Sequence, residues 1–156
     1  MKIMDFLHKK AVTVDLKSRD KKGVIRELVA LTIRTGEVKP KDKESLVKIL
    51  FDRELLGSTG IGLNIGIPHG KSPGVKNLIG AVGISKPGVN FDSLDGEPAY
   101  IFFLLIAPQE SAGPHLKALA RISRLLKDKY FRDMLRNASS EKDLLSAIAK
   151  EDQKRH

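Results

Sequence analysis

Hydrophobic and polar positions recur along the chain with two different periods, which predicts a protein of mixed α-helices and β-strands. Residues 12–16 are rich in β-branched side chains and predict a first strand. Two segments repeat their apolar positions at helical spacing: residues 20–35, and the stretch that begins at Pro40 and ends before Gly57. Leu55 is expected on the apolar face of the second of these helices.

The second half of the chain carries the strongest strand signals. Residues 78–85 predict a buried strand, and the Lys-Pro-Gly sequence at 86–88 predicts a turn after it. A further turn is predicted at residues 93–96. Residues 100–107 form a continuous apolar run, which is typical of a central strand that is covered on both faces.

From Pro114 onward the pattern is helical. Leu116 is expected among the buried positions of a first helix, a short helix is predicted near residues 130–136, and Ser140 is a suitable N-cap for a last helix. No internal repeat or linker interrupts the pattern. We therefore expect one domain over residues 1–150, followed by a frayed tail at residues 151–156.

Composition and charge narrow the range of functions. The chain has no cysteine, which excludes disulfides and thiol catalysis. Its 28 Lys and Arg residues outnumber its 19 Asp and Glu residues and give a formal net charge of +9, but the two signs are interspersed and only 5% of the residues are aromatic. A solvated surface is therefore favoured over nucleic-acid binding. Neither a signal peptide nor a membrane-spanning apolar run is found, so we expect a cytoplasmic protein without membrane insertion.

The glycine-rich segment at residues 58–72, STGIGLNIGIPHGKS, invites comparison with two phosphate-binding motifs. A P-loop would need a glycine at position 65, where the chain has Ile65. The dinucleotide-binding fingerprint fails at the same position. Nucleotide binding is therefore disfavoured.

His69 stands in a rigid frame within this segment. Pro68 restricts the backbone before it, and Gly70 permits another chain to approach closely after it. Residues 65–67 predict a short strand, so we expect His69 at a strand end, on an exposed rim. Imidazole is a suitable nucleophile toward phosphorus because much of it is uncharged near neutral pH. A turn histidine without a chemical role is the alternative on spacing alone.

Other polar residues could assist a phosphoryl group on His69. Arg53 ends the preceding helix and could form two hydrogen bonds to the phosphoryl oxygens, or else an ion pair with a neighbouring carboxylate. His115 is expected in the first turn of a helix, either as a hydrogen-bond donor to phosphate or as a capping or core residue. Ser58 and Thr59 could bind the same oxygens or stabilise the turn. The histidines do not show metal-ligand spacing, so no metal site is expected.

Several stretches together resemble one family. Residues 53–62 (RELLGSTGIG) and 65–70 (IGIPHG) resemble the signature of type-2, mannitol/fructose-type enzyme IIA domains of the phosphoenolpyruvate-dependent phosphotransferase system. Residues 88–108 and 115–128 resemble the later strand, loop and helix of the same family, so the resemblance covers nearly the whole chain. It implies a single-domain α/β sandwich in which a mixed β-sheet is flanked by helices on both faces.

The resemblance also implies a chemistry, that of a phosphoryl-transfer component with a phosphohistidine intermediate. His69 would be the phosphorylated nucleophile, on Nε2, and His115 and Arg53 would assist it as catalytic residues. Such a carrier requires no ATP, metal or organic cofactor. The expected phosphate-binding positions are Ser58, Thr59 and Gly70.

Partners follow from the same resemblance. Phosphate would arrive from the histidine phosphocarrier protein. The uninterrupted STGIG sequence and the stand-alone chain are most similar to the nitrogen-regulatory branch, whose members bind target proteins, such as a kinase or a potassium transporter, according to their phosphorylation state. The alternatives are a sugar-specific IIA component that passes phosphate to a IIB protein, and an inert binding domain, against which the intact reactive residues argue. Asn64 and Gly66 depart from the family pattern of glycine and alanine, and they bear on loop geometry and partner preference.

Overall fold

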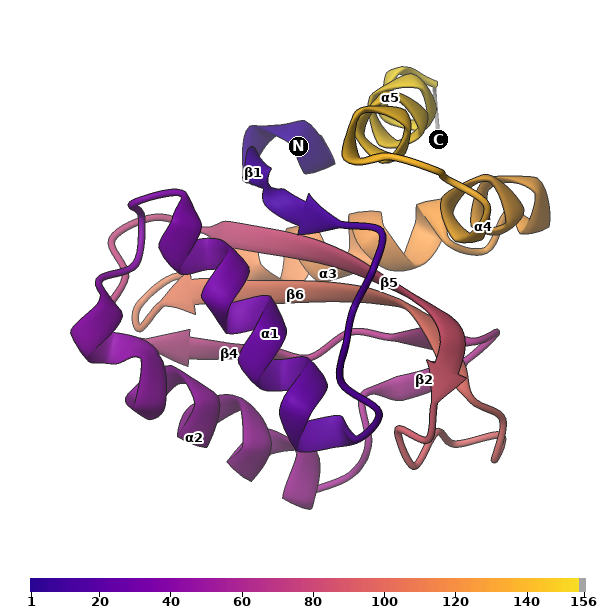
Figure 1. Ribbon diagram of the computed structural model, residues 1–156. Helices are drawn as coiled ribbons and strands as arrows, with labels where there is room; N and C mark the ends of the chain where they lie inside the picture. The colour runs from indigo at the N-terminus through magenta and orange to yellow at the C-terminus, as the bar shows by residue number, and fades with distance from the viewer. Residues whose placement is uncertain (155–156) are drawn as a thin grey trace.

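The computed structural model describes residues 1–154, and in this part of the chain six strands form one mixed sheet (Figure 1). The strand order is β1-β5-β6-β3-β2, and β4 also pairs with β6. β1 runs parallel to β5, β5 antiparallel to β6, and β3 and β4 both run parallel to β6. The strands are β1 (Leu7–Thr13), β2 (Gly60–Gly62), β3 (Ile65–Gly66), β4 (His69–Ser72), β5 (Ile79–Val89) and β6 (Ala99–Pro108).

Helices cover the sheet on both faces. α1 (Lys21–Arg34) and α2 (Lys43–Leu55) pack on one face, and α3 (Ala112–Leu125) and α4 (Lys129–Arg136) pack on the other (Figure 1). α5 (Glu141–Gln153) lies over β1 and α4. The expected fold class, a single-domain α/β sandwich with helices on both faces of a mixed sheet, is confirmed.

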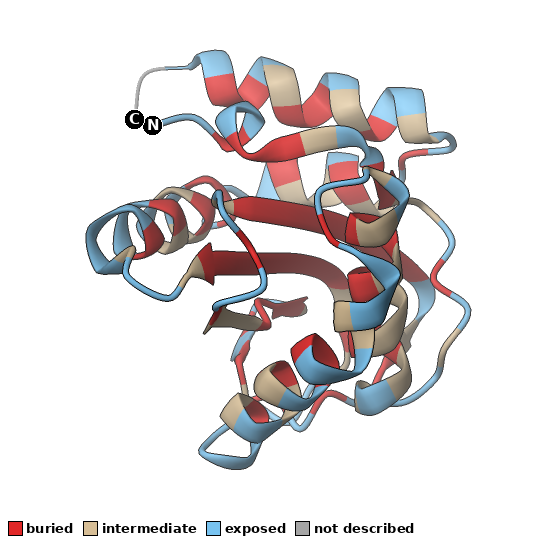
Figure 2. Ribbon diagram, turned by 90° about the vertical axis from the view of Figure 1, so that its left-hand side faces the viewer, coloured by how far each residue is buried: buried red, intermediate tan, exposed pale blue. Residues whose placement is uncertain are grey.

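β6 is the central strand that the apolar run predicts. Residues 101–107 are all buried, and the sheet is buried along most of its length in Figure 2. β5 pairs with one side of β6 and β3 and β4 pair with the other, while helices exclude water from both faces. A strand in this position has no solvent-facing side, so its side chains do not alternate between apolar and polar.

The first strand begins earlier than the pattern predicts. β1 lies at the edge of the sheet, and the exposed side chains of Lys9 and Lys10 interrupt its apolar pattern. The predicted strand at residues 12–16 therefore captures only its end. Leu16 lies beyond β1 and is buried, and its N–H donates to the carbonyl of Ile84 at 2.9 Å.

The turn predicted at residues 86–88 is wrong, because β5 continues to its end at Val89. The pairing of β5 with β6 shifts register between Ile84 and Val89. Such an irregularity accommodates Pro87, which has no N–H to donate to the ladder. The turn predicted at residues 93–96 is confirmed, since the Gly96 N–H donates to the Ser93 carbonyl at 2.9 Å.

The frayed tail predicted at residues 151–156 is wrong for its first residues, because α5 continues to Gln153. Asp152 is only 1% exposed. Its carboxylate accepts from the Met4 N–H at 2.9 Å and pairs with Arg121 at 3.0 Å. These bonds hold the end of α5 against the start of the chain. The remainder of the predicted tail, residues 155–156, lies outside the described residues.

Candidate functional site

His69 is the first residue of β4, beside the centre of the sheet. β3 and β4 pair with successive parts of β6, so residues 65–72 form one strand that is interrupted at Pro68. The Pro68 carbonyl still accepts a hydrogen bond from the Leu105 N–H at 3.0 Å. The ring of His69 is therefore held at a strand interruption, and the residue is half-buried rather than on a fully exposed rim.

One hydrogen bond determines the tautomer of His69. Its Nδ1 lies 2.7 Å from the carbonyl oxygen of Ile67. A carbonyl oxygen can only accept a hydrogen bond, so Nδ1 carries the ring proton. In the neutral ring the lone pair is then on Nε2, which is the nitrogen available for attack on phosphorus.

His115 lies directly beside this ring. It is in the first turn of α3, as expected, and its backbone N–H donates to the Ser111 carbonyl at 3.1 Å. The ring centroids of His69 and His115 are 5.5 Å apart, with an angle of 55° between the ring planes. Within residues 1–154, the buried Nδ1 of His115 has no hydrogen-bond partner. Buried polar atoms are rarely left unpaired without a functional reason, and a reacting group is one.

The pKa values of both histidines lie below the usual range. Burial is the main cause for His69; the charge of Arg53 lowers its pKa further, while the hydrogen bond to Ile67 raises it. Burial also lowers the pKa of His115, and the charges of His69 and Lys71 add to that effect. Both rings are therefore uncharged at neutral pH. His69 keeps its nucleophilic lone pair, and His115 can act as a neutral hydrogen-bond donor.

Arg53 lies in the last turn of α2, and its charge is close enough to affect the pKa of His69. Its Nη1 donates to the carbonyl of Gly57 at 2.8 Å. The neighbouring carboxylate of Asp52 pairs instead with Lys48 at 2.7 Å. A guanidinium binds a phosphoryl group much more strongly than a neutral carbonyl. The bond to Gly57 is thus one that Arg53 can exchange for phosphate.

The hydroxyl groups of Ser58 and Thr59 have partners within the fold. The Ser58 hydroxyl donates to the carbonyl of Phe91 at 2.8 Å. The Thr59 hydroxyl donates to the carboxylate of Glu54, and Thr59 is only 3% exposed. In this geometry both hydroxyls hold the loop in place, and neither reaches a phosphoryl group on His69 without giving up its partner.

Gly70 has a packing reason to lack a side chain. A β-carbon at this position would lie 3.0 Å from Cγ2 of Ile49, on α2. The sequence predicts that a chain segment approaches closely at Gly70. In the structure this segment is α2, which packs against β4. Side chains alternate along a strand, so Gly70 faces α2 while His69 faces the opposite side, toward His115.

Glu54 belongs to the site, although the sequence pattern does not single it out. Its side chain is 1% exposed, accepts from the Thr59 N–H at 3.1 Å, and pairs with Lys21 at 3.3 Å. Lys21 lies equally close to Asp92, 3.3 Å away. The carboxylate of Glu54 therefore joins the start of α1 to the loop after α2, whose Gly57 carbonyl accepts from Arg53. A glutamate beside an arginine on a helix is usually a solvated charge, so only the fold reveals its burial.

Lys71 is a second residue of the site that sequence reasoning missed. Alternation along β4 places its side chain on the same face as that of His69. Its charge contributes to the lowered pKa of His115. Within residues 1–154 no carboxylate pairs with it. Side chains on one face of a strand recur every two residues, so Lys71, two positions after His69, could have been identified from the sequence.

Exposed apolar side chains lie on the chain segments that carry these groups and on the loops next to them. They lie at the end of α2, in and after β2, in the loop before β6, and beside His115 on α3. The expectation that Leu55 and Leu116 are buried is wrong, since they are 72% and 66% exposed. Exposed apolar clusters mark contact surfaces. The set, here named the apolar rim, is Leu55, Leu56, Ile61, Leu63, Leu94 and Leu116.

The structure gives physical reasons for the two unusual loop residues. Asn64 has a φ of +64°, in the left-handed region that asparagine tolerates better than most residues, and its side-chain amide donates to the Pro98 carbonyl at 2.7 Å. At Gly66 a β-carbon would lie 2.9 Å from the ring of Phe102 and 3.3 Å from that of Phe91. Alanine would therefore not fit at position 66 without a movement of these rings.

We expect Gly66→Ala to destabilise the protein by about 1–3 kcal/mol, because it overpacks a closed part of the core. Urea denaturation followed by circular dichroism measures the difference. Gly113→Ala is the matched control, since no atom lies within 4 Å of the β-carbon it would add on α3, and it should leave the free energy of unfolding unchanged or slightly higher. Equal stability of the Gly66→Ala variant and the unmodified protein would contradict this account.

Within residues 1–154, no three His, Asp or Glu side chains are grouped as metal ligands would be. None of the helices in this part of the chain has the length and apolar character needed to span a bilayer. His8, far from His69 in the chain, accepts a hydrogen bond from the Lys10 N–H at 3.0 Å.

Comparisons with known proteins agree with this geometry. A family model described as "Phosphoenolpyruvate-dependent sugar phosphotransferase system, EIIA 2" matches residues 5–151. The nitrogen regulatory protein of Bradyrhizobium diazoefficiens is 35% identical over 149 residues, which are 96% of this chain and 95% of that protein. The fructose-specific EIIABC component of Bacillus subtilis is 37% identical over 152 residues, or 97% of this chain, but the chain spans only 24% of that longer protein.

Solved structures extend the comparison. The crystal structure of nitrogen regulatory protein IIA-Ntr from Neisseria meningitidis superimposes with a TM-score of 0.84 at 31% identity, covering 94% of this chain and 98% of that one. IIA mannitol from Escherichia coli has a TM-score of 0.75 at 21% identity, covering 90% and 97% of the two chains, which supports the fold alone. The chain therefore belongs to the EIIA 2 family of the phosphoenolpyruvate-dependent sugar phosphotransferase system and is one of its phosphoryl carriers.

Proposed function

We propose that the chain carries its phosphoryl group on Nε2 of His69 and receives it from a histidine phosphocarrier protein. The observation that supports this most directly is the hydrogen bond from Nδ1 of His69 to the Ile67 carbonyl. It leaves the Nε2 lone pair free on a ring whose pKa is lowered by burial. His115, at 5.5 Å between centroids, and Arg53 supply a donor and a positive charge.

The transfer is an in-line displacement between two imidazoles. The Nε2 lone pair of His69 forms a bond to phosphorus while the bond from phosphorus to the donor's nitrogen breaks, and that electron pair returns to the donor ring. Arg53 exchanges the Gly57 carbonyl for the phosphoryl oxygens, and His115 donates a hydrogen bond to them. The apolar rim excludes water once the partner docks, which limits hydrolysis of the phosphohistidine. The reverse of the same step delivers the phosphoryl group to a second protein.

The nitrogen-regulatory role is the one that the comparisons favour. The nitrogen regulatory protein of Bradyrhizobium diazoefficiens matches this chain over 95% of its own length, and the IIA-Ntr structure matches it over 98%. In this role, phosphorylated and free forms would bind different target proteins, such as a kinase or a transporter. The cytoplasmic location expected from the sequence is part of this proposal.

Sugar transport is the second candidate, because the fructose-specific component is 37% identical to this chain. In that role the phosphoryl group would pass from His69 to a IIB protein. A solved complex of enzyme IIA mannitol with phosphorylated IIB mannitol provides a precedent for such docking by a protein of the same fold. Capture of a IIB domain by the immobilised phosphorylated chain would favour transport, and phosphorylation-dependent capture of a kinase or transporter would favour regulation.

The direct test is phosphorylation of the purified chain with phosphoenolpyruvate, enzyme I and the histidine phosphocarrier protein. We expect one acid-labile phosphate per chain by intact-mass measurement, and a phosphohistidine on Nε2 by long-range ¹H–¹⁵N NMR. Omission of the phosphocarrier protein should prevent labelling. Labelling at Nδ1, or at a residue other than histidine, would contradict the proposal.

The lowered pKa of His69 predicts how phosphoryl uptake depends on pH. The neutral ring is the reactive form, and a lower pKa keeps it neutral at pH values where an ordinary histidine is already protonated. The rate of phosphoryl uptake by His69 should therefore stay constant as the pH falls through about 6.5, and it should decline only at lower pH. An NMR titration of the His69 ring protons locates the pKa directly. A midpoint at or above the ordinary value for histidine would refute the burial argument.

A further inference from the structure

A cavity of about 490 Å³ lies at the far end of α2 from His69. It is lined by the connection between α1 and α2, which includes Gly36 and Lys39, and by the segment that joins β4 to β5, which includes Gly74 and Lys76. This volume is in the range of pockets that hold small metabolites. Arg53 lies in the last turn of α2, whereas Asp42, which lines the cavity, immediately precedes the first residue of that helix. The 11 positions between them correspond to roughly 17 Å at about 1.5 Å per residue, so the two sites are separate.

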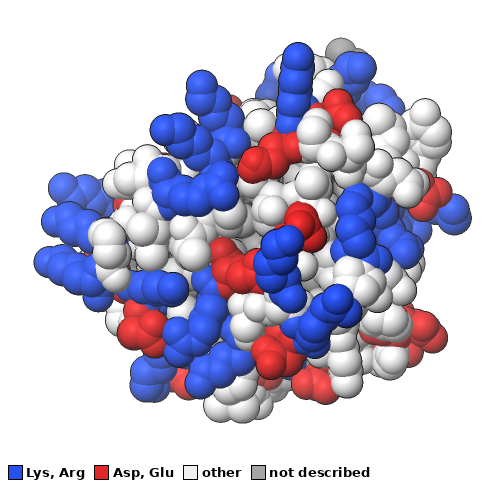
Figure 3. All heavy atoms as spheres, viewed as in Figure 1, with Lys and Arg blue, Asp and Glu red and all other residues white. Residues whose placement is uncertain are grey.

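Three lysines line this cavity: Lys39, Lys41 and Lys76. Among residues 1–154, none of their amino groups has an ion pair or a side-chain hydrogen bond. Figure 3 shows Lys and Arg side chains gathered on the left of the molecule, where Figure 1 places the connection between α1 and α2. Unpaired positive charges around a concave surface attract and retain anions.

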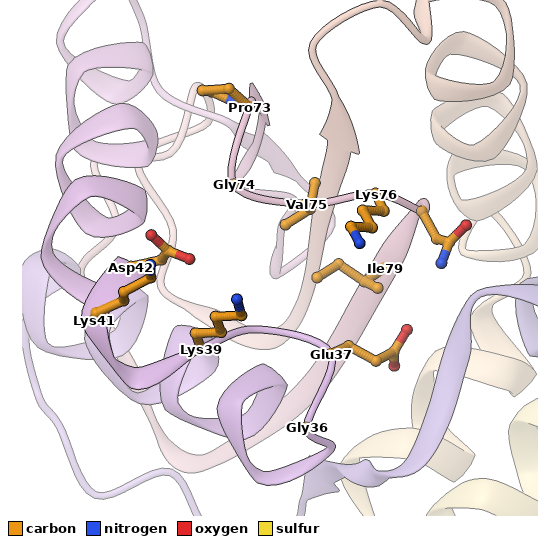
Figure 4. A pocket seen from close by; sticks show the side chains of 11 residues that line it. Gly36, Glu37, Lys39, Lys41, Asp42, Pro73, Gly74, Val75, Lys76 and Ile79 are labelled. Carbon is orange, nitrogen blue, oxygen red and sulfur yellow. The ribbon is translucent and has the colours of Figure 1, made fainter.

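Two of these lysines point into the cavity from different segments of the chain. In Figure 4 the amino groups of Lys39 and Lys76 point toward one another, beside Ile79. Ile79 and Val75 are 2% and 5% exposed and give this part of the cavity an apolar wall. An anion between the two amino groups would be held from two sides, next to a surface that displaces water. Both conditions strengthen charged hydrogen bonds.

Two carboxylates flank this cationic centre. Asp42 lies on one side of Lys39 and Glu37 on the other in Figure 4. A carboxylate repels a second anion but accepts hydrogen bonds from hydroxyl groups. The cavity thus has acceptors for hydroxyl groups on either side of a site for an anion. An isolated inorganic anion would use only the centre.

From this arrangement we propose that the cavity binds a small phosphate monoester that carries hydroxyl groups, a class that includes sugar phosphates. Its phosphate lies between Lys39 and Lys76, and its hydroxyl groups donate to Asp42 or Glu37. Lys41 adds positive charge at the entrance. This site takes its ligand without covalent change, and it does not depend on the chemistry at His69.

Isothermal titration calorimetry of the full chain with glucose 6-phosphate, at low ionic strength, tests the site. We expect Lys39→Gln/Lys76→Gln to weaken binding by about tenfold or more, since two charged hydrogen bonds are lost. Lys127→Gln/Lys142→Gln is the matched control, with the same loss of charge at two exposed lysines that are remote in sequence from the cavity, and it should bind within about twofold of the unmodified protein. Equal weakening in both variants would mean that net charge alone attracts the ligand, and would overturn the proposal.

The role of the carboxylates is tested with Asp42→Ala, whose side chain does not cap α2. This variant should bind glucose 6-phosphate more weakly but inorganic phosphate equally well or more tightly, because a repulsive charge is removed. Glucose itself should not bind. Absence of glucose 6-phosphate binding to the unmodified chain, or a stronger affinity for inorganic phosphate than for glucose 6-phosphate, would overturn the proposal. None of these results depends on phosphorylation of His69, so failure here leaves the proposed function intact, and the reverse also holds.

Discussion

Replacing His69 by alanine is expected to abolish phosphoryl uptake from the histidine phosphocarrier protein. The variant lacks Nε2 of His69, which the geometry presents with a free lone pair beside a second ring and a guanidinium. Incubation with phosphoenolpyruvate, enzyme I and the phosphocarrier protein, followed by intact-mass measurement, should detect no acid-labile phosphate. Labelling of this variant to the level of the unmodified chain would move the reactive residue elsewhere.

Two further histidine variants sharpen this result. His115→Ala should still reach full labelling, but about 10²-fold more slowly, because one hydrogen-bond donor to the transferred group is lost while the nucleophile remains. His8→Ala should behave as the unmodified chain, since His8 belongs to β1, an edge strand that β5 and β6 separate from β4, the strand of His69. An effect of His8→Ala as large as that of His115→Ala would point to general destabilisation rather than to chemistry.

Replacing Glu54 by alanine is expected to cost about 3 kcal/mol of stability and to slow phosphoryl transfer. The carboxylate is the buried partner of Lys21 and of both the N–H and the hydroxyl of Thr59. Its removal leaves the N–H and the hydroxyl of Thr59, a residue only 3% exposed, without an acceptor, and leaves Lys21 with Asp92 as its one remaining carboxylate partner within residues 1–154. The loop that carries Gly57, the partner of Arg53, would lose its anchor. Urea denaturation measures the first effect, and the rate of labelling measures the second.

Glu44→Ala is the matched control for this prediction. Glu44 lies on the same helix and pairs with Arg26 at 2.8 Å, but its side chain is 69% exposed. Exposed pairs contribute little, so stability and labelling rate should hardly change. Glu54→Gln separates packing from charge, because it keeps the shape of the side chain but not the ion pair with Lys21. If Glu54→Ala unfolds no more easily than Glu44→Ala, the buried network has no structural role.

Much of the fold was predictable because its signals are local. Helical spacing identified α1, α2 and α5, and the cap at Ser140 is confirmed by its bond from the Asp143 N–H at 3.1 Å. The continuous apolar run identified β6 as the central strand. The errors occurred where tertiary contacts decide the structure. Exposed Lys9 and Lys10 make part of β1 resemble a loop, and the predicted frayed tail includes Asp152, which is buried.

The candidate site divides in the same way. Pro68, His69 and Gly70 form a contiguous sequence signal, and His115 has a helix-start signal of its own, so each could be identified from its neighbours. Their proximity could not, because β4 and α3 are far apart in the chain and meet only through their packing on β6. The hydrogen-bond partners of Ser58 and Thr59 could not be predicted from the sequence either, since the same local pattern allows a hydroxyl to bind phosphate or to bind groups within the protein.

The sequence by itself determined the class of fold and the family, and it singled out His69 as the proposed reactive residue, because apolar periodicity and a contiguous motif can be recognised without knowledge of distant contacts. Only the tertiary structure decided which ring nitrogen of His69 is free, which carboxylate is buried, and which leucines are exposed. Each of these depends on the conformation of the folded chain, which brings the Ile67 carbonyl to the ring of His69, brings Lys21 to Glu54, and leaves Leu55 and Leu116 in solvent. Burial and hydrogen bonding are properties of neighbours in space, so they arise only when the chain has folded.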